Sequence, residues 1–306
     1  MDIVLKTHGL TKRYKRQLAV NGVEMQINRG DIYGFVGENG SGKTTVIRLI
    51  TGLIFPQSGG FSLFGVDHRS KDIGKARSRI GAIVETPSIY LNMSAVDNLK
   101  TQSILLGVED DSRIRQVLED VGLGYLYGEK KHAGNFSLGM RQRLGIAMAL
   151  LSDPELLILD EPMNGLDPAG IVEIRELILK LNREKGITFL ISSHILTELS
   201  LVATKYGIIS KGKILQEITA EELRHACAKT TFLRVDQPEQ LQEIFANSFV
   251  DIRQEPTAEG AKIYGDIDLT QLLAAVIGAG IRILSVQCNE TSFEDYYLSV
   301  TGGNRS

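Results

Sequence analysis

The sequence has little cysteine and no long hydrophobic run, and both shortages limit what the protein can be. Its 306 residues include only two cysteines, Cys227 and Cys288, which form no C-x-x-C pair. This pattern indicates neither a disulfide framework nor a zinc site. The longest mostly apolar stretch, residues 272–284, contains two glycines and Arg282 and is too short to cross a bilayer. We therefore expect any membrane association to depend on a partner.

The N-terminus and the distribution of charge argue against two further classes. Residues 1–4 lack the basic n-region and the long apolar h-region of a signal peptide, so we expect a cytoplasmic protein. Residues 219–306 carry 7 basic and 13 acidic residues, a net charge of −6, whereas residues 1–218 carry 27 and 24, a net charge of +3. Neither part has the dense basic face of a nucleic-acid binder, so we expect no DNA or RNA partner.

What the sequence does contain is a glycine-rich loop between a predicted strand and a predicted helix. Residues 37–45 match the pattern G-x-x-x-x-G-K-[ST], with an apolar run before them and a helical pattern after them. Glycines let backbone N–H groups point at phosphate oxygens, and a helix N-terminus favours an anion. We therefore predict nucleotide binding, with Lys43 on the β- and γ-phosphates and Thr44 on Mg²⁺. The loop residues are Gly37, Glu38, Asn39, Gly40, Ser41, Gly42, Lys43, Thr44 and Thr45.

Two acidic residues and a histidine follow apolar strands of the predicted sheet. Asp160 and Glu161 come directly after strand 156–159, and His194 follows strand 187–191 and two serines. In open α/β sheets, ligands bind at the carboxyl ends of the strands. Asp160 is therefore predicted to bind Mg²⁺, Glu161 to polarise the water that attacks the γ-phosphate, and His194 to hydrogen-bond that phosphate or the water. The alternatives are a helix cap for the acidic pair and an ordinary surface position for the histidine.

The pattern of elements predicts an α/β fold over residues 1–218. Apolar strands separated by helices are typical of a parallel sheet that is covered on both faces. A strand begins at residues 3–5, residues 9–14 are predicted to be a loop, and residues 86–151 are predicted to form a helical subdomain. The other predicted strands cover residues 20–27, 31–36, 61–63, 80–84, 156–159, 187–191, 206–209 and 213–218.

Residues 219–306 are predicted to form a second, smaller α+β domain. After an opening helix, its order is strand-helix-strand-strand-helix-strand-helix, which is close to the ferredoxin-like arrangement. The predicted segments are helix 220–229, strand 230–235, helix 240–249, strands 250–254 and 261–264, helix 269–278, strand 281–288 and helix 292–300. This part contains no phosphate loop and no cluster of histidine, cysteine or carboxylate, so its residues predict no chemical role.

The order of motifs over residues 3–218 resembles the ATP-binding subunit of an ABC transporter. Residues 37–45 resemble Walker A, 156–162 Walker B, 164–167 the D-loop, 192–194 the switch-histidine segment and 136–142 the family's signature. The resemblance implies a P-loop NTPase fold and Mg²⁺-dependent ATP hydrolysis. It also implies a multi-spanning membrane permease as partner and an active dimer of two cassettes around two ATP molecules.

The same resemblance implies nucleotide contacts outside the loop. Tyr14 matches the aromatic residue that stacks on adenine, and Asp167 lies in the D-loop. Ser137 and Gly139 are kept in a signature that reads Phe-Ser-Leu-Gly-Met instead of Leu-Ser-Gly-Gly-Gln, and in the family they face the ATP of the partner subunit. A further departure is Glu85, where the family usually has glutamine; an ionised carboxylate only accepts hydrogen bonds. Glu85 either contacts Mg²⁺ and the γ-phosphate, opposing closure, or points away toward the permease.

These departures, with the chain length and residues 292–295, resemble the bacitracin-resistance and lantibiotic-immunity branch of the family. That branch implies export of, or resistance to, a peptide antibiotic. The alternative is a non-transport ABC ATPase in DNA repair or at the ribosome. About ninety residues separate Lys43 and Ser137, which leaves no room for a long coiled coil, and there is one cassette rather than two. A nucleotide kinase is a third hypothesis, against which the signature and D-loop argue.

Overall fold

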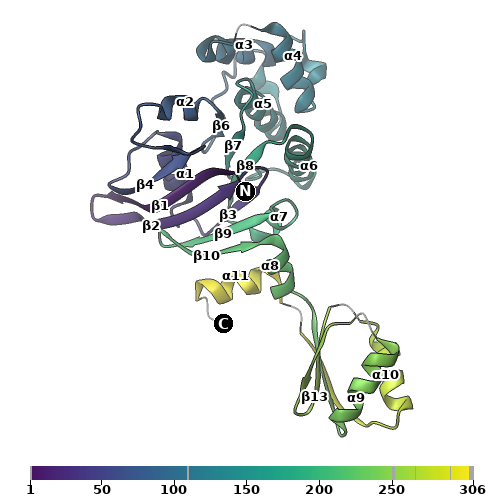
Figure 1. Ribbon diagram of the computed structural model, residues 1–306. Helices are drawn as coiled ribbons and strands as arrows, with labels where there is room; N and C mark the ends of the chain where they lie inside the picture. The colour runs from purple at the N-terminus through teal and green to yellow at the C-terminus, as the bar shows by residue number, and fades with distance from the viewer. Residues whose placement is uncertain (1, 109, 250–251, 266, 290, 303–306) are drawn as a thin grey trace. The chain divides into compact units, whose positions relative to one another are not determined.

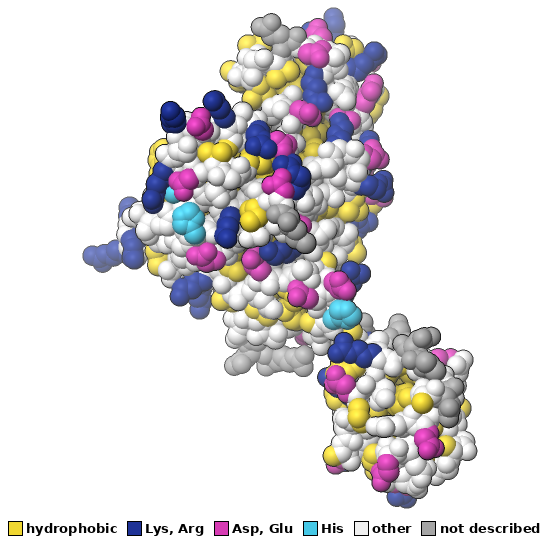
Figure 2. Space-filling model, in the orientation of Figure 1, with side chains coloured by type: hydrophobic (Ala, Val, Ile, Leu, Met, Phe, Trp, Pro, Cys, Tyr) yellow, Lys and Arg dark blue, Asp and Glu magenta, His cyan; other side chains and the backbone are white. Residues whose placement is uncertain are grey.

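Figure 1 shows the computed structural model, which describes residues 2–108, 110–249, 252–265, 267–289 and 291–302. The chain divides into two compact units, one ending at Ala220 and the other beginning at Glu221. On the visible face of each unit, lysine and arginine are interspersed with aspartate and glutamate (Figure 2). Among the described residues, no helix combines the length and the apolar character needed to cross a membrane.

The larger unit is built on a six-stranded sheet with the order β10-β9-β3-β8-β7-β6. All neighbours are parallel except β10 and β9. Every residue of β3, β7 and β8 is buried, as expected for strands covered on both faces, so the predicted α/β class is confirmed. The strands are β3 (Ile32–Val36), β6 (Ile80–Ile83), β7 (Leu156–Asp160), β8 (Thr188–Ser193), β9 (Lys205–Ser210) and β10 (Lys213–Thr219).

A second, antiparallel sheet has the order β2-β1-β4-β5. Its strands are β1 (Ile3–Tyr14), β2 (Gln17–Asn28), β4 (Ser58–Leu63) and β5 (Val66–Asp67). The predicted loop at residues 9–14 is wrong, because β1 continues to Tyr14 and pairs with β2 along its length. Gly9 has a positive φ of 56° where the pairing register shifts, so this glycine marks a bulge inside the strand rather than its end.

Helix α1 (Lys43–Thr51) shares one core with strands of both sheets. Its apolar side chains Val46, Ile47, Leu49 and Ile50 are fully buried among residues of the two sheets. The helix ends at Gly52, whose left-handed φ of 84° is a backbone conformation that glycine adopts without strain. A helix buried on this scale is fixed in place, and it therefore fixes the loop that precedes it.

The helical region consists of α3 (Ala95–Leu106), α4 (Asp111–Asp120) and α5 (Leu138–Leu150), which lie together in Figure 1. Helix α3 begins with a capping box, in which the Ser94 hydroxyl accepts from the Asp97 N–H at 3.1 Å and the Asp97 carboxylate accepts from the Ser94 N–H. This unit also contains the α-helices α2 (Ile73–Arg77), α6 (Pro168–Lys185) and α7 (Leu196–Ser200) and two short 3-10 helices at Gly124–Leu126 and Ala133–Asn135.

The smaller unit contains an antiparallel sheet with the order β12-β13-β11-β14. Its elements are α8 (Ala220–Ala226), β11 (Thr230–Val235), α9 (Leu241–Ser248), β12 (Gln254–Thr257), β13 (Gly260–Tyr264), α10 (Leu269–Gly278), β14 (Ile283–Asn289) and α11 (Phe293–Thr301). This is the predicted order of elements, and one core joins the sheet to α9 and α10. The opening helix ends earlier than predicted. The strand predicted at 250–254 is also displaced: residues 250 and 251 lie outside the described residues, and β12 begins at Gln254, where its hairpin with β13 sets the pairing.

Candidate nucleotide site

The glycine-rich loop connects the buried strand β3 to the buried helix α1. A Cβ atom on Gly37 would lie 2.4 Å from the Ile209 carbonyl oxygen, and Gly42 has a φ of 113°, so neither position tolerates another residue without strain. The N-terminus of α1 has no side-chain cap and no acidic residue in its first turn. Because α3, α5 and α6 all begin with a side-chain cap, α1 alone of these four presents bare N–H groups to an anion.

A cavity of about 290 Å³ opens at this loop. The Ser41 hydroxyl is buried and has no hydrogen-bond partner among the described residues, so it lacks the acceptor that a phosphate oxygen would supply. The cavity is lined by Tyr14, Gln17, Ala19, Asn39, Gly40, Gly42, Lys43, Thr44, Thr45 and Glu161. Most of the predicted loop contacts, the predicted adenine contact and the predicted catalytic acid thus meet in one place.

Glu161 connects the loop lysine to the histidine of the next strand. Its Oε1 lies 3.2 Å from Lys43 Nζ, and its Oε2 lies 2.7 Å from His194 Nδ1. Lys43 is 5% exposed and also donates to the carbonyls of Gly37 at 2.6 Å and Glu38 at 3.2 Å. The three predicted catalytic residues therefore form one continuous set of ion pairs and hydrogen bonds.

Asp160 is the last residue of β7 and is 1% exposed. Its Oδ1 accepts a hydrogen bond of 2.5 Å from the Ser192 hydroxyl on the neighbouring strand β8. The next residue, Glu161, has a left-handed φ of 50°, which is unusual for a residue with a side chain. This turn of the backbone sends two consecutive carboxylates in different directions, one beside β8 and the other into the cavity.

A second acidic residue, Glu198, contacts the segment that carries His194 through Ser193. Glu198 lies on α7, and its carboxylate accepts from the Ser193 hydroxyl at 3.3 Å. The Ser193 hydroxyl oxygen also accepts from the Ile195 N–H at 3.0 Å. Burial raises the pKa of Glu198, and the nearby charge of Glu161 raises it further. Side-chain contacts therefore hold the segment around His194: Glu161 contacts the histidine itself, and the Ser193 hydroxyl connects Glu198 to the Ile195 N–H.

Ser137, Gly139 and Asp167 lie around a different cavity, which has a volume of about 480 Å³ and shares no residue with the first. The Ser137 hydroxyl caps α5 by accepting from the Met140 N–H at 3.1 Å. The Asp167 carboxylate caps α6 by accepting from the Gly170 N–H at 3.0 Å. Within one chain, the signature and D-loop residues are thus together but apart from the phosphate loop.

Glu85 does not line either cavity. Its backbone has a left-handed φ of 65°, and its carboxylate accepts from Arg48 on α1 at 2.5 Å. Both side chains are well exposed, at 58% and 38%. The structure therefore places the Glu85 carboxylate against a cation of this chain.

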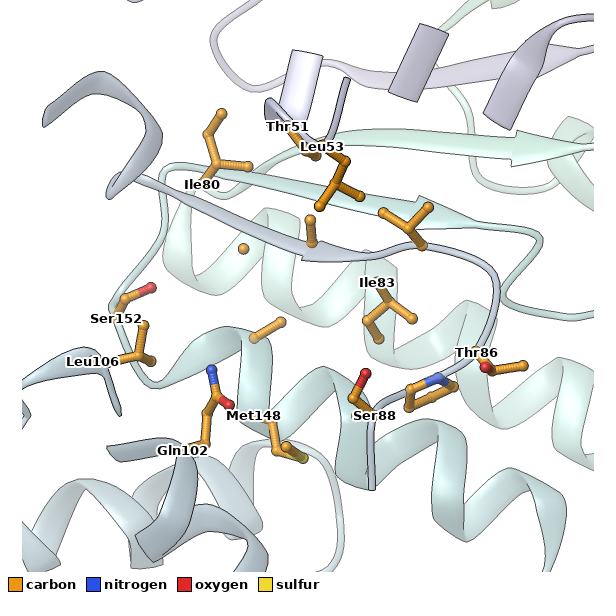
Figure 3. A pocket seen from close by; sticks show the side chains of 16 residues that line it. Thr51, Leu53, Ile80, Ile83, Thr86, Ser88, Gln102, Leu106, Met148 and Ser152 are labelled. Carbon is orange, nitrogen blue, oxygen red and sulfur yellow. The ribbon is translucent and has the colours of Figure 1, made fainter. Parts of the chain in front are cut away.

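A third cavity, of about 400 Å³, lies between β6 and the C-terminal halves of α3 and α5 (Figure 3). Figure 3 shows Ile80 and Ile83 of β6 on one side and Gln102, Leu106 and Met148 of the helices on the other. Residues 84, 86, 87 and 88 also line it, so the segment that carries Glu85 forms part of its wall. We call this cavity the β6 groove.

Comparison with known proteins gives the same result as the geometry. Residues 20–164 match the family model described as ABC transporter. The chain is 41% identical to the bacitracin transport ATP-binding protein BcrA of Bacillus licheniformis, over 99% of each chain. The chain belongs to the ABC transporter ATP-binding proteins.

Other ABC transporter ATP-binding proteins support this assignment. The lantibiotic transport ATP-binding protein SrtF of Streptococcus pyogenes is 41% identical over 81% of this chain and 98% of its own. The solved structure of cbiO1 from Clostridium perfringens, part of the ABC transporter complex cbiONQ, is 26% identical with a TM-score of 0.66 and covers 81% of this chain and 96% of its own. The ADP conformation of MJ1267, an ATP-binding cassette of an ABC transporter, is 28% identical with a TM-score of 0.65 and covers 72% of this chain and 93% of its own. Membership of this family carries ATP binding and ATP hydrolysis.

Sequence reasoning missed three contributors to the site of this ABC ATPase. Gln17 and Ala19 line the loop cavity from β2, and no motif marks them. Ser192 was predicted to follow a strand, but β8 extends to Ser193, so the Ser192 side chain lies within the sheet beside Asp160. The sequence signal that could have revealed Ser192 is the pair of serines that directly follows the apolar residues of β8.

Proposed function

We propose that this protein is a Mg²⁺-dependent ATPase that works as a pair of cassettes at the cytoplasmic face of the membrane and drives a separately encoded, multi-spanning permease. Residues 1–218 would supply the cassette and the smaller unit an accessory domain. The observation that carries the proposal is the bridging of Lys43 and His194 by Glu161 at an uncapped helix N-terminus.

The bridge suggests how ATP binding would prepare the site for hydrolysis. An arriving γ-phosphate offers Lys43 and His194 a stronger negative partner than a single carboxylate. Lys43 would then leave Glu161, whose freed oxygens could hold and polarise a water molecule for in-line attack. Because His194 Nδ1 faces Glu161, Nε2 is the ring nitrogen available to a phosphate oxygen.

The residues also fit the Mg²⁺ that the family implies. Thr44 lines the loop cavity, and Asp160 ends β7 with one carboxylate oxygen held by Ser192. Hydroxyl, carboxylate and phosphate oxygens are the hard ligands that Mg²⁺ prefers, and the cation would neutralise phosphate charge. In the described part of the chain no group of three or more His, Cys, Asp or Glu side chains could hold a metal, so the phosphates would have to complete the site.

The separation of the two cavities supports a dimer in which each cassette completes the site of the other. The cavity at Ser137 and Asp167 has no glycine-rich loop in its lining, and the Arg143 and Glu173 side chains that line it pair with each other at 3.2 Å. Its helix N-termini are already capped, so its groups are arranged to meet a ligand that is held elsewhere. The ATP bound by a second copy of the chain is that ligand in our proposal.

The β6 groove is the surface we assign to the permease. It is rimmed by exposed apolar side chains, including Leu53 at 63% and Leu106 at 42%. Its wall contains residues 84 and 86, while Glu85 between them contacts Arg48 on the helix that begins at the phosphate loop. A permease segment in the groove would therefore press on a segment that is connected to the nucleotide site.

The cargo is proposed to be a peptide antibiotic, because the relatives named above are transport proteins for bacitracin and lantibiotics. Two measurements test the proposal. Purified protein should release phosphate from ATP with no acceptor present, and chelation of Mg²⁺ should stop that release. Co-expression of this protein with its permease should raise the bacitracin or lantibiotic concentration that cells survive, whereas co-expression of the Glu161→Gln variant with the permease should not. ATP hydrolysis without protection of the cells would reject the proposed antibiotic cargo and leave the proposed ATPase activity standing.

A further inference from the structure

Ser192 is a buried serine between the two acids of the site. It is fully buried on the central strand β8, where it pairs with Asp160 of β7. Its hydroxyl donates to Asp160 Oδ1 at 2.5 Å and accepts from the backbone N–H of Glu161 at 2.9 Å. The Ser192 carbonyl accepts from the same N–H at 3.2 Å. One residue therefore contacts the side chain of the first acid and the backbone of the second.

The contact with Glu161 falls at the strained point of the site. The left-handed φ of Glu161 persists only if surrounding interactions hold it, and its N–H is directed at two acceptors of Ser192. The direction of the Glu161 carboxylate toward Lys43 and His194 depends on this backbone conformation. Loss of the hydroxyl removes the shorter of the two hydrogen bonds that hold it.

The contact with Asp160 fixes a carboxylate that has little other support. Asp160 is 1% exposed, and among the described residues the Ser192 hydroxyl is its one side-chain hydrogen-bond donor. A hydrogen bond to one oxygen sets the rotation of the carboxylate and leaves the other oxygen for a further ligand. A hydroxyl is needed here, because only a group that both donates and accepts can serve Asp160 and Glu161 together.

We infer that Ser192 is a positioning residue for hydrolysis, which orients Asp160 and holds the backbone turn that aims Glu161. The inference rests on the proposed ATPase function. Ser192 is not among the residues that line the loop cavity, so it should affect the chemical step and Mg²⁺ use more than ATP binding itself. It would thus join the two acids as a unit of the site.

Thr188, at the other end of the same strand, provides a matched control. It is also fully buried, and its hydroxyl accepts from the Gly30 N–H at 3.0 Å, away from the loop cavity. Ser192→Ala and Thr188→Val each remove one buried hydroxyl that accepts a backbone N–H. Comparable losses of melting temperature are expected for the two variants.

The experiment measures kcat, KM and equilibrium ATP binding as a function of Mg²⁺ for the full-length wild type and both variants. Ser192→Ala should lower kcat about tenfold or more with KM for ATP changed less than about twofold, since a hydrogen bond made to a charged group is lost. It should also raise the Mg²⁺ concentration needed for half-maximal enhancement of ATP binding. Thr188→Val should leave kcat and the Mg²⁺ dependence unchanged.

The outcomes separate this inference from the proposed function. A wild type that does not hydrolyse ATP would reject the proposed function. An active wild type whose kcat falls equally in both variants would overturn the positioning role, as would a Ser192→Ala variant with unchanged kcat and Mg²⁺ dependence.

Discussion

The two cavities of the cassette differ in how their polar groups are satisfied. At the loop cavity, Lys43, Glu161 and His194 are held by one another, the helix N-terminus is uncapped and the Ser41 hydroxyl has no partner among the described residues. The cavity around Ser137, Gly139 and Asp167 is called the signature cavity here. Its Ser137 and Asp167 side chains already accept hydrogen bonds at the N-termini of α5 and α6. The polar groups of the first cavity can exchange their present partners for phosphate oxygens, whereas Ser137 and Asp167 already serve the helices that they cap. Substitutions should therefore act on chemistry or binding at the first and on assembly at the second.

The largest effect is expected for Glu161→Gln. The amide keeps the shape of the side chain but cannot serve as a base, so kcat should fall by at least about a hundredfold while ATP binding is retained. Steady-state hydrolysis and fluorescent-nucleotide binding measure the two quantities. Turnover near the wild-type rate would show that the bridge between Lys43 and His194 is only structural.

Lys43→Ala tests the same cavity through binding. It removes the one lysine that lines the cavity, so ATP affinity should weaken about 10- to 100-fold, the range expected for charge-assisted hydrogen bonds. Isothermal titration gives the dissociation constant, and Lys6→Ala, which removes an exposed lysine from β1, provides a control. An unchanged ATP affinity of the Lys43→Ala variant would contradict the assignment of ATP binding to the loop cavity.

Mixed dimers test whether the signature cavity acts on the other chain. Ser137→Arg should inactivate a dimer by placing a bulky cation at the second cavity, and Glu161→Gln inactivates the first. In a dimer of one chain of each kind, both lesions fall at one site and the other site is intact. Phosphate release should therefore rise above that of either variant alone; no recovery, when cross-linking shows that mixed dimers form, would place the two cavities at the same ATP.

A smaller effect is expected at Glu85, which lies outside both cavities. Glu85→Gln and Arg48→Gln break the same exposed ion pair from opposite sides, and exposed pairs contribute at most about 1 kcal/mol. The basal ATPase rate should therefore change less than about twofold, while permease-stimulated hydrolysis should fall in both variants. A rise of the basal rate in Glu85→Gln alone would show that this carboxylate reaches the γ-phosphate and opposes closure.

The smallest effect is expected from an ion-pair cluster that belongs to neither cavity. Hydrogen bonds from Arg79, supported by Arg29, hold the pKa of Glu155 at about 2, below its ordinary 4.5. The resulting stabilisation is present above pH 4.5 and is lost as the pH falls from 4.5 toward 2, because the folded state then binds the proton less readily than the unfolded state. Glu155 is 35% exposed, so with solvent screening Glu155→Gln should cost roughly 1 kcal/mol in denaturant unfolding at neutral pH. A change in kcat would contradict its purely structural role.

The sequence predicted the parts of the site that depend on local pattern. The loop spacing, the acids after an apolar strand and the order of motifs placed Lys43, Asp160, Glu161 and His194 before any coordinates. Such positions can be predicted because glycine turns and strand ends depend on residues that are adjacent in the chain. The order of elements in the smaller unit was readable for the same reason.

What the sequence could not predict depends on pairing between distant segments. Gly9 reads as the end of a strand, and only the pairing of β1 with β2 makes it a bulge. Glu85 has a left-handed backbone that no pattern announces, so its contact with Arg48 could not be foreseen. Ser192 gains its place only when β8 lies beside β7, more than thirty residues away in the chain.

The order of strands in the central sheet determines when the nucleotide site can form during synthesis and folding of the chain. β3, which leads into the phosphate loop, takes both of its neighbours, β8 and β9, from residues 188–210. The Gly37 N–H that opens the loop bonds to the Ser193 carbonyl, and the Ser41 carbonyl accepts from the Gly212 N–H. A nascent chain therefore presents its loop residues long before the strands that support them have been synthesised. Pairings between segments so far apart in the chain form late in folding. Nucleotide binding would therefore indicate that nearly the whole cassette has folded.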